Sequence, residues 1–523
     1  MMEPRHRMKT AGQNEDLNSS VWWLDLPDEA ATAALARHIS ELVTSGDLLT
    51  LSGDLGAGKT SFARALIRHI CRDEELEVPS PTFTLMQIYS GPSFPVVHAD
   101  LYRIKSADEL VELGWDEAAE GALVIVEWPD RAGDKLPLDR LDIALFVEPA
   151  QGDTWRRAKL TGHGAFAQKL ARAKGIDRLL VRAGWADARR SFMLGDASSR
   201  AYERLQKPDG QQAVLMISPP RPDGPPVRYG KPYSAIARLA EDIRPFIAVA
   251  EALRAQDLSA PNIHAADLET GLAIIEDLGS DPFVDAKGPI AERYGEAVAV
   301  LAKLHSTQLP EAIPLGADTY RIPPYDIDAL IIEVELLTEW YTQHASIHLS
   351  SGAAATFINL WRAVLKEMVD GPKTWVLRDY HSPNLIWLAD REGLQRVGII
   401  DFQDCVMGSP AYDVASLLQD ARVTVPNELE LKLLSHYARQ RLARDPQFDM
   451  SLFARAYAIM AAQRATKILG IFARLDRRDR KPQYLAHMPR IQNYLAKSLQ
   501  HPALSELKIW YETYLPAVFG AGS

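Results

Sequence analysis

Cysteine is scarce in this 523-residue chain, which has only Cys71 and Cys405, in neither a CxxC pair nor a Cys/His cluster. We therefore expect neither a disulfide framework nor a structural zinc site. Long apolar runs are also missing, since no stretch approaches the ~20 residues that span a bilayer. The polar first 20 residues lack the apolar segment of a secretory signal. These absences predict a cytoplasmic protein.

A surplus of positive charge is missing as well. The chain has 58 Lys and Arg against 69 Asp and Glu, a net charge of -11. This balance argues against a mainly electrostatic grip on nucleic acid, although it leaves room for a local basic patch. Hydrophobic residues make up 47% and charged residues 24%, as in soluble globular chains with a core. The length suggests two to four domains at about 150 residues each.

In the first third of the chain, strands alternate with helices. Segment 59–70 has apolar residues near 3.6-residue spacing and predicts a helix. Segments rich in Val, Ile and Leu predict strands at 47–53, 95–100, 122–128 and 141–147. This alternation predicts an α/β layer with a largely parallel sheet, to which 156–160 adds a last edge strand.

The rest of the chain follows a different pattern. Segments 191–205 and 211–218 look like a hairpin, and a Pro-rich loop follows at 219–232. Helical stretches dominate after residue 234 and are interrupted by short strands at 374–380, 385–389 and 396–404. A small β-rich lobe followed by a helical lobe predicts an α+β arrangement.

The stretch "GDLGAGKT" is a candidate phosphate-binding loop. It reads Gly-x4-Gly-Lys-Thr between a predicted strand and a predicted helix, which is the Walker A pattern. Gly53, Gly56 and Gly58 let the backbone form a cradle of N–H groups at the positive end of the helix. Lys59 offers a charge to the β- and γ-phosphates, and Thr60 offers a hydroxyl to Mg²⁺. The pattern predicts ATP and Mg²⁺ as cofactors; the alternative is an ordinary Gly-rich turn.

A P-loop needs an acidic residue at the end of a neighbouring strand to hold the metal. Glu127 follows four apolar residues in "LVIVE" and fits that role as a catalytic and metal-binding residue. Asp100, which closes "VVHAD", is a rival carboxylate, and a role as a helix cap or turn residue explains it equally well.

These motifs form part of an ordered set that resembles the TsaE family over roughly residues 20–165. The set is "GDLGAGKT", "SPTFTL" (80–85), "HADLYR" (98–103), "ELVELGWDE" (109–117) and "VIVEWPDR" (124–131). The resemblance implies Mg-ATP hydrolysis coupled to a TsaB–TsaD assembly that makes threonylcarbamoyladenosine at position 37 of tRNAs. Because that assembly holds the tRNA, an acidic protein fits this role.

The resemblance also assigns residues. It implies that the Walker A lysine and threonine bind phosphate and metal, and that Glu127 serves the metal or its water. Thr82 and Thr84 lie in a switch-like segment. Trp128 matches a family tryptophan, for which a packed aromatic is the alternative interpretation.

A second motif set lies in the helical part. Asp379 stands five residues before Asn384, and Asp401 ends the apolar strand "RVGII" before a phenylalanine. This is the spacing of the catalytic loop and metal aspartate in protein-kinase-like enzymes. In that chemistry Asp379 accepts a proton from the attacking hydroxyl, while Asn384 and Asp401 hold Mg²⁺.

The nucleotide-binding motifs of this second site depart from the usual kinase pattern. The loop "LGDASSRAY" has one glycine, so Ser198, Ser199 and backbone N–H groups would cover the phosphates. Met216 stands where a phosphate-pairing lysine is expected. Arg200 is a candidate for the missing charge, and a solvated arginine is the alternative. In the catalytic motifs, Leu377 replaces a common histidine and Gln403 a glycine.

This half resembles the aminoglycoside phosphotransferase superfamily and, within it, AmgK-type kinases of N-acetylmuramate and N-acetylglucosamine. The likeness rests on "GDASSRAYERL", "VLMISPP", "IIEDLG", "LRDYHSPNL" and residues 399–423. It implies phosphate transfer from ATP to the C1 hydroxyl of an amino sugar in cell-wall recycling. It places Glu276 at the hinge beside adenine and gives Asp413 a role in orienting the catalytic loop or capping a helix. His381 is either a catalytic group or a loop histidine bonded to backbone.

The sequence thus predicts a bifunctional multidomain protein, with a P-loop NTPase fold followed by a two-lobed kinase-like fold. The expected parts are a flexible N-terminus (1–19), a TsaE-like domain (20–165), a linker (166–175), a small lobe (176–280) and a helical lobe (281–523). Alternatives stay open. One alternative is that the second half is a catalytically silent nucleotide-binding module. Another is that it is a kinase whose acceptor is an aminoglycoside, choline or homoserine. A third is that the first half is a small-molecule kinase.

Overall fold

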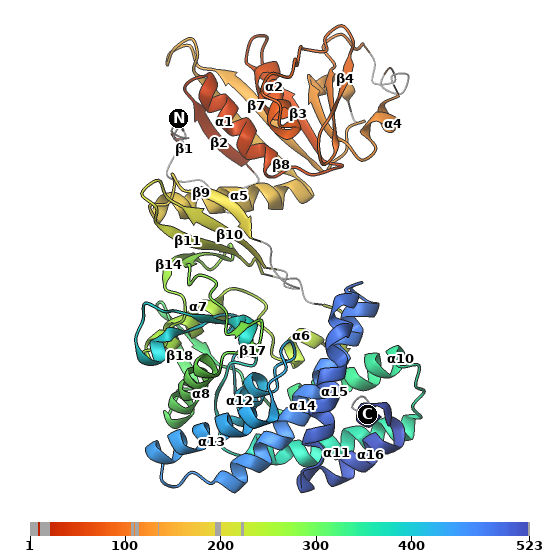
Figure 1. Cartoon of the computed structure of the whole chain (residues 1–523). Helices are drawn as coiled ribbons and strands as arrows, with labels where there is room; N and C mark the ends of the chain where they lie inside the picture. Colours follow the sequence, from red (N-terminus) through yellow and green to blue (C-terminus); the bar gives the residue numbers. More distant parts are fainter. Residues whose placement is uncertain are drawn as a thin grey trace. The chain divides into compact units, whose positions relative to one another are not determined.

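The computed structural model describes residues 9–10, 21–105, 109, 114–133, 135–193, 200–220 and 224–520. The chain divides into two compact units, residues 1–187 and 188–523. In Figure 1 the first unit runs from red to gold and the second from gold to blue. Apart from Lys9–Thr10, the predicted flexible N-terminus lies outside the described residues. Among the described residues, no helix combines the length and the hydropathy needed to cross a bilayer.

A mixed eight-stranded sheet forms the first unit, in the order β1-β2-β8-β7-β3-β6-β5-β4. Its central strands β7, β3, β6 and β5 run parallel, and they are the four that the sequence predicted. The bounds are β1 (Lys9–Thr10), β2 (Val21–Leu26), β3 (Leu48–Ser52), β4 (Met86–Ser90), β5 (Pro95–Asp100), β6 (Leu123–Glu127), β7 (Arg140–Val147) and β8 (Arg156–His163). The predicted edge strand at 156–160 is β8, but it is interior because β2 pairs along its outer side.

Helices cover the sheet of the first unit. They are α1 (Glu29–Ser40), α2 (Lys59–Cys71), α4 (Trp115–Ala119) and α5 (Ala165–Arg182), with a 3₁₀ turn η1 (Pro129–Ala132). Asp28 caps α1 by accepting from the Ala31 amide at 2.7 Å. Leu35 of α1 and Phe62 and Leu66 of α2 are fully buried in one core with β2, β3, β7 and β8. This packing holds β3 and α2 in place on either side of the Walker A loop.

Helix α5 occupies the segment where the sequence predicted a linker at 166–175. Phe166, Leu170 and Ala173 lie one helical turn apart and are buried in the core of the first unit. Lys174 donates to the Val21 carbonyl at 2.9 Å. The unit therefore extends to residue 187, because an amphipathic helix follows the turn at Gly164.

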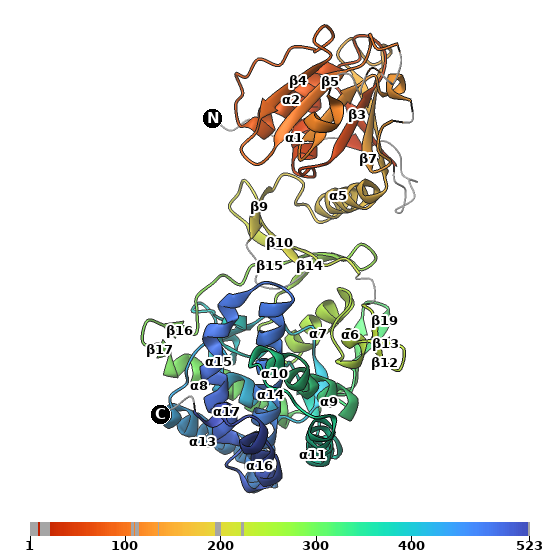
Figure 2. The ribbon, with the colours of Figure 1, turned by 90° about the vertical axis from the view of Figure 1, so that its right-hand side faces the viewer.

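The second unit begins with an antiparallel five-stranded sheet in the order β14-β15-β11-β10-β9. The predicted hairpin segments form β9 to β11, with β10 paired to both neighbours. The bounds are β9 (Arg189–Met193), β10 (Ala201–Gln206), β11 (Gln212–Ile217), β14 (Ile263–Asp267) and β15 (Leu272–Glu276). Helix α7 (Arg244–Arg254) shares a hydrophobic core with this sheet. Figure 2 shows the curved sheet from its side.

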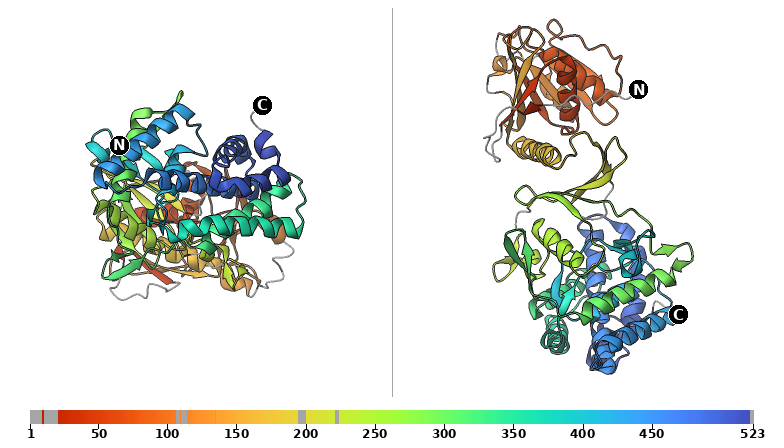
Figure 3. Two further views of the ribbon diagram at one scale, coloured as in Figure 1. Left: turned by 90° about the horizontal axis from the view of Figure 1, so that it is seen from below. Right: turned by 90° about the vertical axis from the view of Figure 1, so that its left-hand side faces the viewer.

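The predicted helical lobe follows and is confirmed. Its longer helices are α8 (Ala291–Ser306), α9 (Ile327–Leu336), α11 (Ser351–Asp370), α12 (Ala411–Leu418), α13 (Asn427–Arg444), α14 (Met450–Arg477), α15 (Met488–Ser498) and α16 (Ser505–Tyr514). Shorter ones are α6 (Tyr233–Ile236), α10 (Thr342–His344), α17 (Ala517–Gly520), a π-helical turn η2 (Leu337–Tyr341) and 3₁₀ turns η3 (Ser382–Asn384), η4 (Gly393–Arg396), η5 (Pro482–His487) and η6 (Pro502–Leu504). Figure 3 shows these helices from two further sides, in green to blue.

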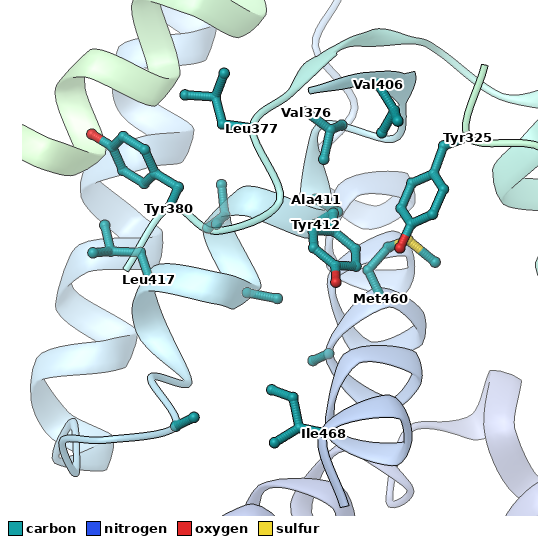
Figure 4. Close-up of a cluster of buried hydrophobic side chains, with 14 of the residues drawn as sticks. Tyr325, Val376, Leu377, Tyr380, Val406, Ala411, Tyr412, Leu417, Met460 and Ile468 are labelled. Carbon is teal, nitrogen blue, oxygen red and sulfur yellow. The ribbon is translucent and has the colours of Figure 1, made fainter. Parts of the chain in front are cut away.

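Short strand pairs complete the second unit. They are β12 (Pro226–Arg228) with β13 (Lys231–Pro232), β16 (Val284–Asp285) with β17 (Gly288–Pro289), β18 (Ala312–Leu315) with β19 (Asp318–Arg321), β20 (Thr374–Val376) with β23 (Val406–Gly408), and β21 (Leu385–Trp387) with β22 (Val397–Ile399). The last two pairs hold the predicted catalytic segments. Beneath them the rings of Tyr325 and Tyr412 meet edge to face with centroids 5.4 Å apart, close to Met460 of α14 (Figure 4). These buried side chains support the loop between β20 and β21.

Candidate active sites

The Walker A loop connects β3 to α2, as the sequence predicted. Gly53, Gly56 and Gly58 have φ angles of +134°, +80° and +103°, which residues with a side chain rarely adopt. At Gly53 a Cβ atom would lie 2.3 Å from the Leu145 carbonyl oxygen. The loop therefore requires glycine for its conformation, and at Gly53 also for its close contact with β7.

Lys59 is buried at the first turn of α2, with 5% of its surface exposed. Its Nζ donates to the carbonyl oxygens of Gly53 and Asp54, each at 2.9 Å. Burial lowers the pKa of Lys59, and the carboxylates of Glu127, Asp100 and Asp54 oppose that shift. The ammonium is thus held over the loop, close to where phosphate would bind.

Thr60 and Glu127 lie 67 residues apart in the sequence and are in contact. The Thr60 hydroxyl bonds to the two Glu127 carboxylate oxygens at 2.9 and 3.1 Å. His98, on the neighbouring strand β5, places Nε2 3.0 Å from Glu127 Oε1 and is fully buried. A hydroxyl and a carboxylate at the end of a strand are oxygen ligands that suit Mg²⁺. The sequence did not single out His98, although it lies in the quoted motif "HADLYR".

Asp100 lies beside Glu127 because β5 and β6 are parallel and the two residues are in register. Its Oδ2 accepts from the hydroxyls of Ser80 at 2.9 Å and Thr82 at 2.6 Å. Its Oδ1 accepts from the amide of Tyr102 at 3.0 Å. Asp100 therefore anchors the switch-like segment and also caps the turn that follows β5.

Trp128 lies against Lys59. The lysine Nζ is 3.8 Å from the centre of the indole ring, within the range of a cation–π interaction. Trp128 has a φ of +60°, which is uncommon for a bulky residue, and its amide donates to the Leu51 carbonyl at 3.1 Å. The ring also packs on Tyr102 with centroids 5.1 Å apart. The fold thus places this aromatic ring at Lys59, the lysine of the Walker A pattern.

In the second unit, the predicted catalytic and metal residues come together between β20 and β23. Asn384 Nδ2 donates to the Asp379 carbonyl at 2.9 Å and lies 3.4 Å from Asp401 Oδ2. Asp401 Oδ1 also accepts from Gln403 Nε2 at 2.8 Å and from Arg200 NH1 at 3.1 Å. Gln403, which replaces the usual glycine, thus orients the Asp401 carboxylate.

The donor set of this second site fits a hydrated cation. A carboxylate and an amide lie together, and among the residues that the structure describes no three His, Cys, Asp or Glu side chains form a metal-binding group. Mg²⁺ keeps waters and takes phosphate oxygens, so two protein ligands suit it.

Asp413 holds the catalytic loop from α12. Its two carboxylate oxygens accept from the amides of Leu377 at 2.7 Å and Arg378 at 2.9 Å. Burial raises the pKa of Asp413 to about 7, although these two hydrogen bonds favour the ionised form. The role implied for Asp413 was to orient the catalytic loop or cap a helix, and these contacts are with the loop.

A buried ion network packs against the same loop, and no pattern in the sequence predicts it. Arg378 pairs with Glu333 of α9, and Lys467 of α14 lies 2.8 Å from the same carboxylate. Tyr325 and Gln463 donate to its other oxygen. Although burial alone raises the pKa of Glu333, the two cations hold it below its usual value. The network ties the residue before Asp379 to two long helices.

His381 is enclosed in the catalytic loop. Burial lowers its pKa, with nearby Asp420 and Asp379 opposing the shift. Its backbone amide donates to the Asp379 carbonyl at 3.1 Å, and its buried Nδ1 has no hydrogen-bond partner among the described residues. A neutral imidazole with backbone contacts agrees with the predicted alternative of a loop histidine bonded to backbone.

The predicted nucleotide-binding residues have different outcomes. Ser198 and Ser199 lie outside the described residues. Glu276 closes β15, but its carboxylate pairs with Arg391 and lies 3.8 Å from Arg254. It lines an open polar cavity of about 540 Å³ with Gln212, Arg254, Asp257, Leu258, Ser259, Asn262, His264, Arg391 and Gln395. The amide of Glu276 also donates to the Asn262 carbonyl at 2.9 Å, so its carboxylate and its amide both have partners within the protein.

Comparison with known proteins divides the chain into the same two parts as the structure does. The family model "Threonylcarbamoyl adenosine biosynthesis protein TsaE" matches residues 26–156, and the model "Phosphotransferase enzyme family" matches residues 191–450. The TsaE protein of Rickettsia typhi is 44% identical over 105 residues, which are 20% of this chain and 72% of that protein. The TsaE protein of Rickettsia felis is 44% identical over 107 residues, 20% of this chain and 62% of that protein.

The second part of the chain has a different set of relatives. The N-acetylmuramate/N-acetylglucosamine kinase of Caulobacter vibrioides is 39% identical over 345 residues, which are 64% of this chain and 94% of that protein. The kinase of the same name from Pseudomonas putida is 33% identical over 316 residues, 60% of this chain and 84% of that protein. The chain therefore belongs to the TsaE family through its N-terminal part and to the N-acetylmuramate/N-acetylglucosamine kinase family through its C-terminal part.

Proposed function

We propose that this enzyme has two activities in the cytoplasm. The first unit hydrolyses ATP in support of threonylcarbamoyladenosine synthesis at position 37 of tRNAs, together with TsaB- and TsaD-like proteins. The second unit transfers the γ-phosphate of ATP to the C1 hydroxyl of N-acetylmuramate or N-acetylglucosamine in cell-wall recycling. Membership of the two families and the two separate sets of site residues support this proposal.

The contact between Thr60 and Glu127 carries the first activity. Mg²⁺, when bound, would neutralise charge on the β- and γ-phosphates. Its protein ligands would be the Thr60 hydroxyl and Glu127, directly or through a water. Lys59 would exchange its bonds to the loop carbonyls for phosphate oxygens. His98 would hold the Glu127 carboxylate in place.

The cluster of Asp379, Asn384 and Asp401 carries the second activity. Asp379 accepts the proton of the sugar C1 hydroxyl while the oxygen of that hydroxyl forms a bond to the γ-phosphorus. The bond between the γ-phosphorus and the β–γ bridging oxygen breaks, and ADP is released. Mg²⁺, when bound, would supply positive charge to the phosphates, with Asn384 and Asp401 as its protein ligands. Asp413 keeps the loop that carries Asp379 in position.

The experiment uses the full chain, Mg-ATP and either amino sugar, and follows sugar 1-phosphate by phosphorus NMR. It compares wild type, Lys59→Ala and Asp379→Ala. Product that is lost only in Asp379→Ala supports the kinase assignment, because Lys59 belongs to the other site. No product in any form, with nucleotide still bound, favours the silent-module or other-acceptor alternatives.

The first activity is tested separately by phosphate release without an acceptor. We expect release to rise on adding TsaB and TsaD proteins and to be lost in Lys59→Ala and Glu127→Gln, while sugar phosphorylation continues. If adding TsaB and TsaD proteins leaves the rate of phosphate release unchanged in every variant, the result argues against the tRNA-modification role. Transfer to a small molecule instead of water would favour the alternative of a P-loop kinase.

A further inference from the structure

The position expected to hold the kinase lysine is closed to a charged side chain. Met216 lies in the centre of β11, paired in register with Tyr202 and Ala273, and it is fully buried in the hydrophobic core. Helix α7, which shares that core, has one acidic residue, Glu251, and it faces solvent. Among the described residues, β11 and α7 therefore place neither that lysine nor its glutamate partner in the interior of the small lobe.

Aromatic packing connects α7 to the metal-binding segment. Phe246 of α7 stacks on Phe402, the residue after Asp401, with ring centroids 5.0 Å apart and 15° between the planes. An apolar contact thus links α7 to the segment after Asp401. In kinases that have the lysine, an ion pair instead joins the lysine strand to the helix. Packing of this kind does not neutralise phosphate charge, so the positive charge has to come from elsewhere.

Arg200 lies where that charge is needed. It immediately precedes β10, the strand hydrogen-bonded to β11, and its NH1 is 3.1 Å from Asp401 Oδ1. Only 8% of the Arg200 side chain is exposed, against 40% for Asp401. Arg200 is therefore not a solvated surface arginine, since its guanidinium is enclosed beside the metal-binding carboxylate.

The contacts of Asp401 suggest how Arg200 acts. Asp401 accepts from Arg200, Gln403 and, at 3.4 Å, Asn384. A divalent cation bound to Asp401 would repel the guanidinium from that carboxylate. Phosphate oxygens would then be its best partners, because the planar N–H fork of arginine matches them in geometry and charge.

We propose that Arg200 is the phosphate-binding cation of the second site and replaces the lysine missing at Met216. The proposal rests on the proposed kinase function of this unit but not on which sugar accepts the phosphate. It assigns the positive charge to the loop end before β10, while β11 and α7 keep an apolar interface.

The test measures binding of adenosine, ADP and ATP with Mg²⁺ by calorimetry. Every protein carries Lys59→Ala, so that the P-loop contributes little to phosphate binding. Loss of a charged hydrogen bond predicts that Arg200→Gln weakens ATP binding about tenfold to a hundredfold, with adenosine binding unchanged. Arg200→Lys should keep more of the ATP affinity. The KM for ATP in sugar phosphorylation should rise most in Arg200→Gln and less in Arg200→Lys.

Arg190→Gln is the matched control, because Arg190 also pairs with a carboxylate on this sheet, that of Glu203 at 2.6 Å. It should leave the affinities for ATP and adenosine unchanged. Equal ATP affinity in the two glutamine variants, or a parallel loss for ATP and adenosine in Arg200→Gln, would overturn the proposal. Absence of sugar phosphate in wild type would count against the acceptor instead, since the binding results do not depend on it.

Discussion

The Nζ atom of Lys59 lies 3.8 Å from the centre of the Trp128 ring. The neutral indole ring can stabilise the ammonium on one side. On the other side, the N–H groups of the ammonium remain directed at the carbonyl oxygens of the loop. The contact gives a physical role to a tryptophan that the sequence marked only by resemblance. It also depends on the end of β6, where Glu127 immediately precedes Trp128.

Replacing Trp128 by leucine should weaken ATP binding at the first site about threefold to thirtyfold, the range of a partly buried cation–π contact. Trp128→Phe keeps an aromatic face and should lie closer to wild type. The measurement is nucleotide affinity by calorimetry in an Asp401→Ala background, which weakens binding at the other site. Trp23→Leu is the control, because Trp23 also has cations over its ring but lies on β2. Equal affinities in Trp128→Leu and Trp128→Phe would contradict the role of the aromatic face.

Asp413 should make stability depend on pH. Its folded pKa of about 7 lies above the ordinary carboxyl value of 3.8, so the folded state binds this proton more tightly than the unfolded state. Its contribution is therefore fully present at low pH and decreases as the pH rises between about 4 and 7. The unfolding free energy of wild type minus that of Asp413→Asn should fall across this window by on the order of 1–4 kcal/mol. Urea unfolding at pH 4 and pH 8 measures this fall, and a constant difference between the two proteins would rule it out.

His305 should make stability depend on pH in the opposite direction, so that stability falls as the pH falls. It is buried, and its Nδ1 lies 2.9 Å from the Tyr437 hydroxyl. Burial, with a smaller effect of Arg441, lowers its pKa to about 3. The unfolded chain takes up a proton near pH 6.5 that the folded chain resists. Stability from this group is thus present above about pH 6.5 and is lost as the pH falls towards 3.

Relative to His305→Phe, wild type should lose a few kcal/mol, about 2–4, between pH 7 and pH 4. Unfolding curves of both proteins at these pH values give the difference. A loss of the same size in both proteins would mean that other groups cause the acid sensitivity.

Two helical glycines give a matched pair of alanine substitutions. A Cβ at Gly470 of α14 would lie 2.4 Å from the carbonyl carbon of Leu336, whereas at Gly295 of α8 it meets nothing within 4 Å. Gly470→Ala should therefore destabilise the second unit by about 1–3 kcal/mol through overpacking. Gly295→Ala should be stabilising by up to about 1 kcal/mol, because alanine costs less entropy in a helix. Thermal unfolding of both variants decides, and shifts of the same sign would contradict the packing argument.

Local patterns determined much of this protein. The Walker A spacing fixed the loop between β3 and α2, since the glycines and the helix start are adjacent in the sequence. Runs of Val, Ile and Leu placed the four parallel strands, because buried parallel strands need continuous apolar residues. The spacing of Asp379, Asn384 and Asp401 identified the second cluster for the same local reason.

Other features depended on contacts between distant segments. No local pattern marks His98 as the partner of Glu127, or Glu333 and Lys467 as the support of Arg378, because each pair is brought together by packing. Segment 166–175 has amphipathic spacing, but only the fold shows that it packs on the first core. The sequence alone determined which chemistry the two sites carry. The tertiary structure decided which buried groups hold those sites in place, because burial and pairing are properties of the packed chain.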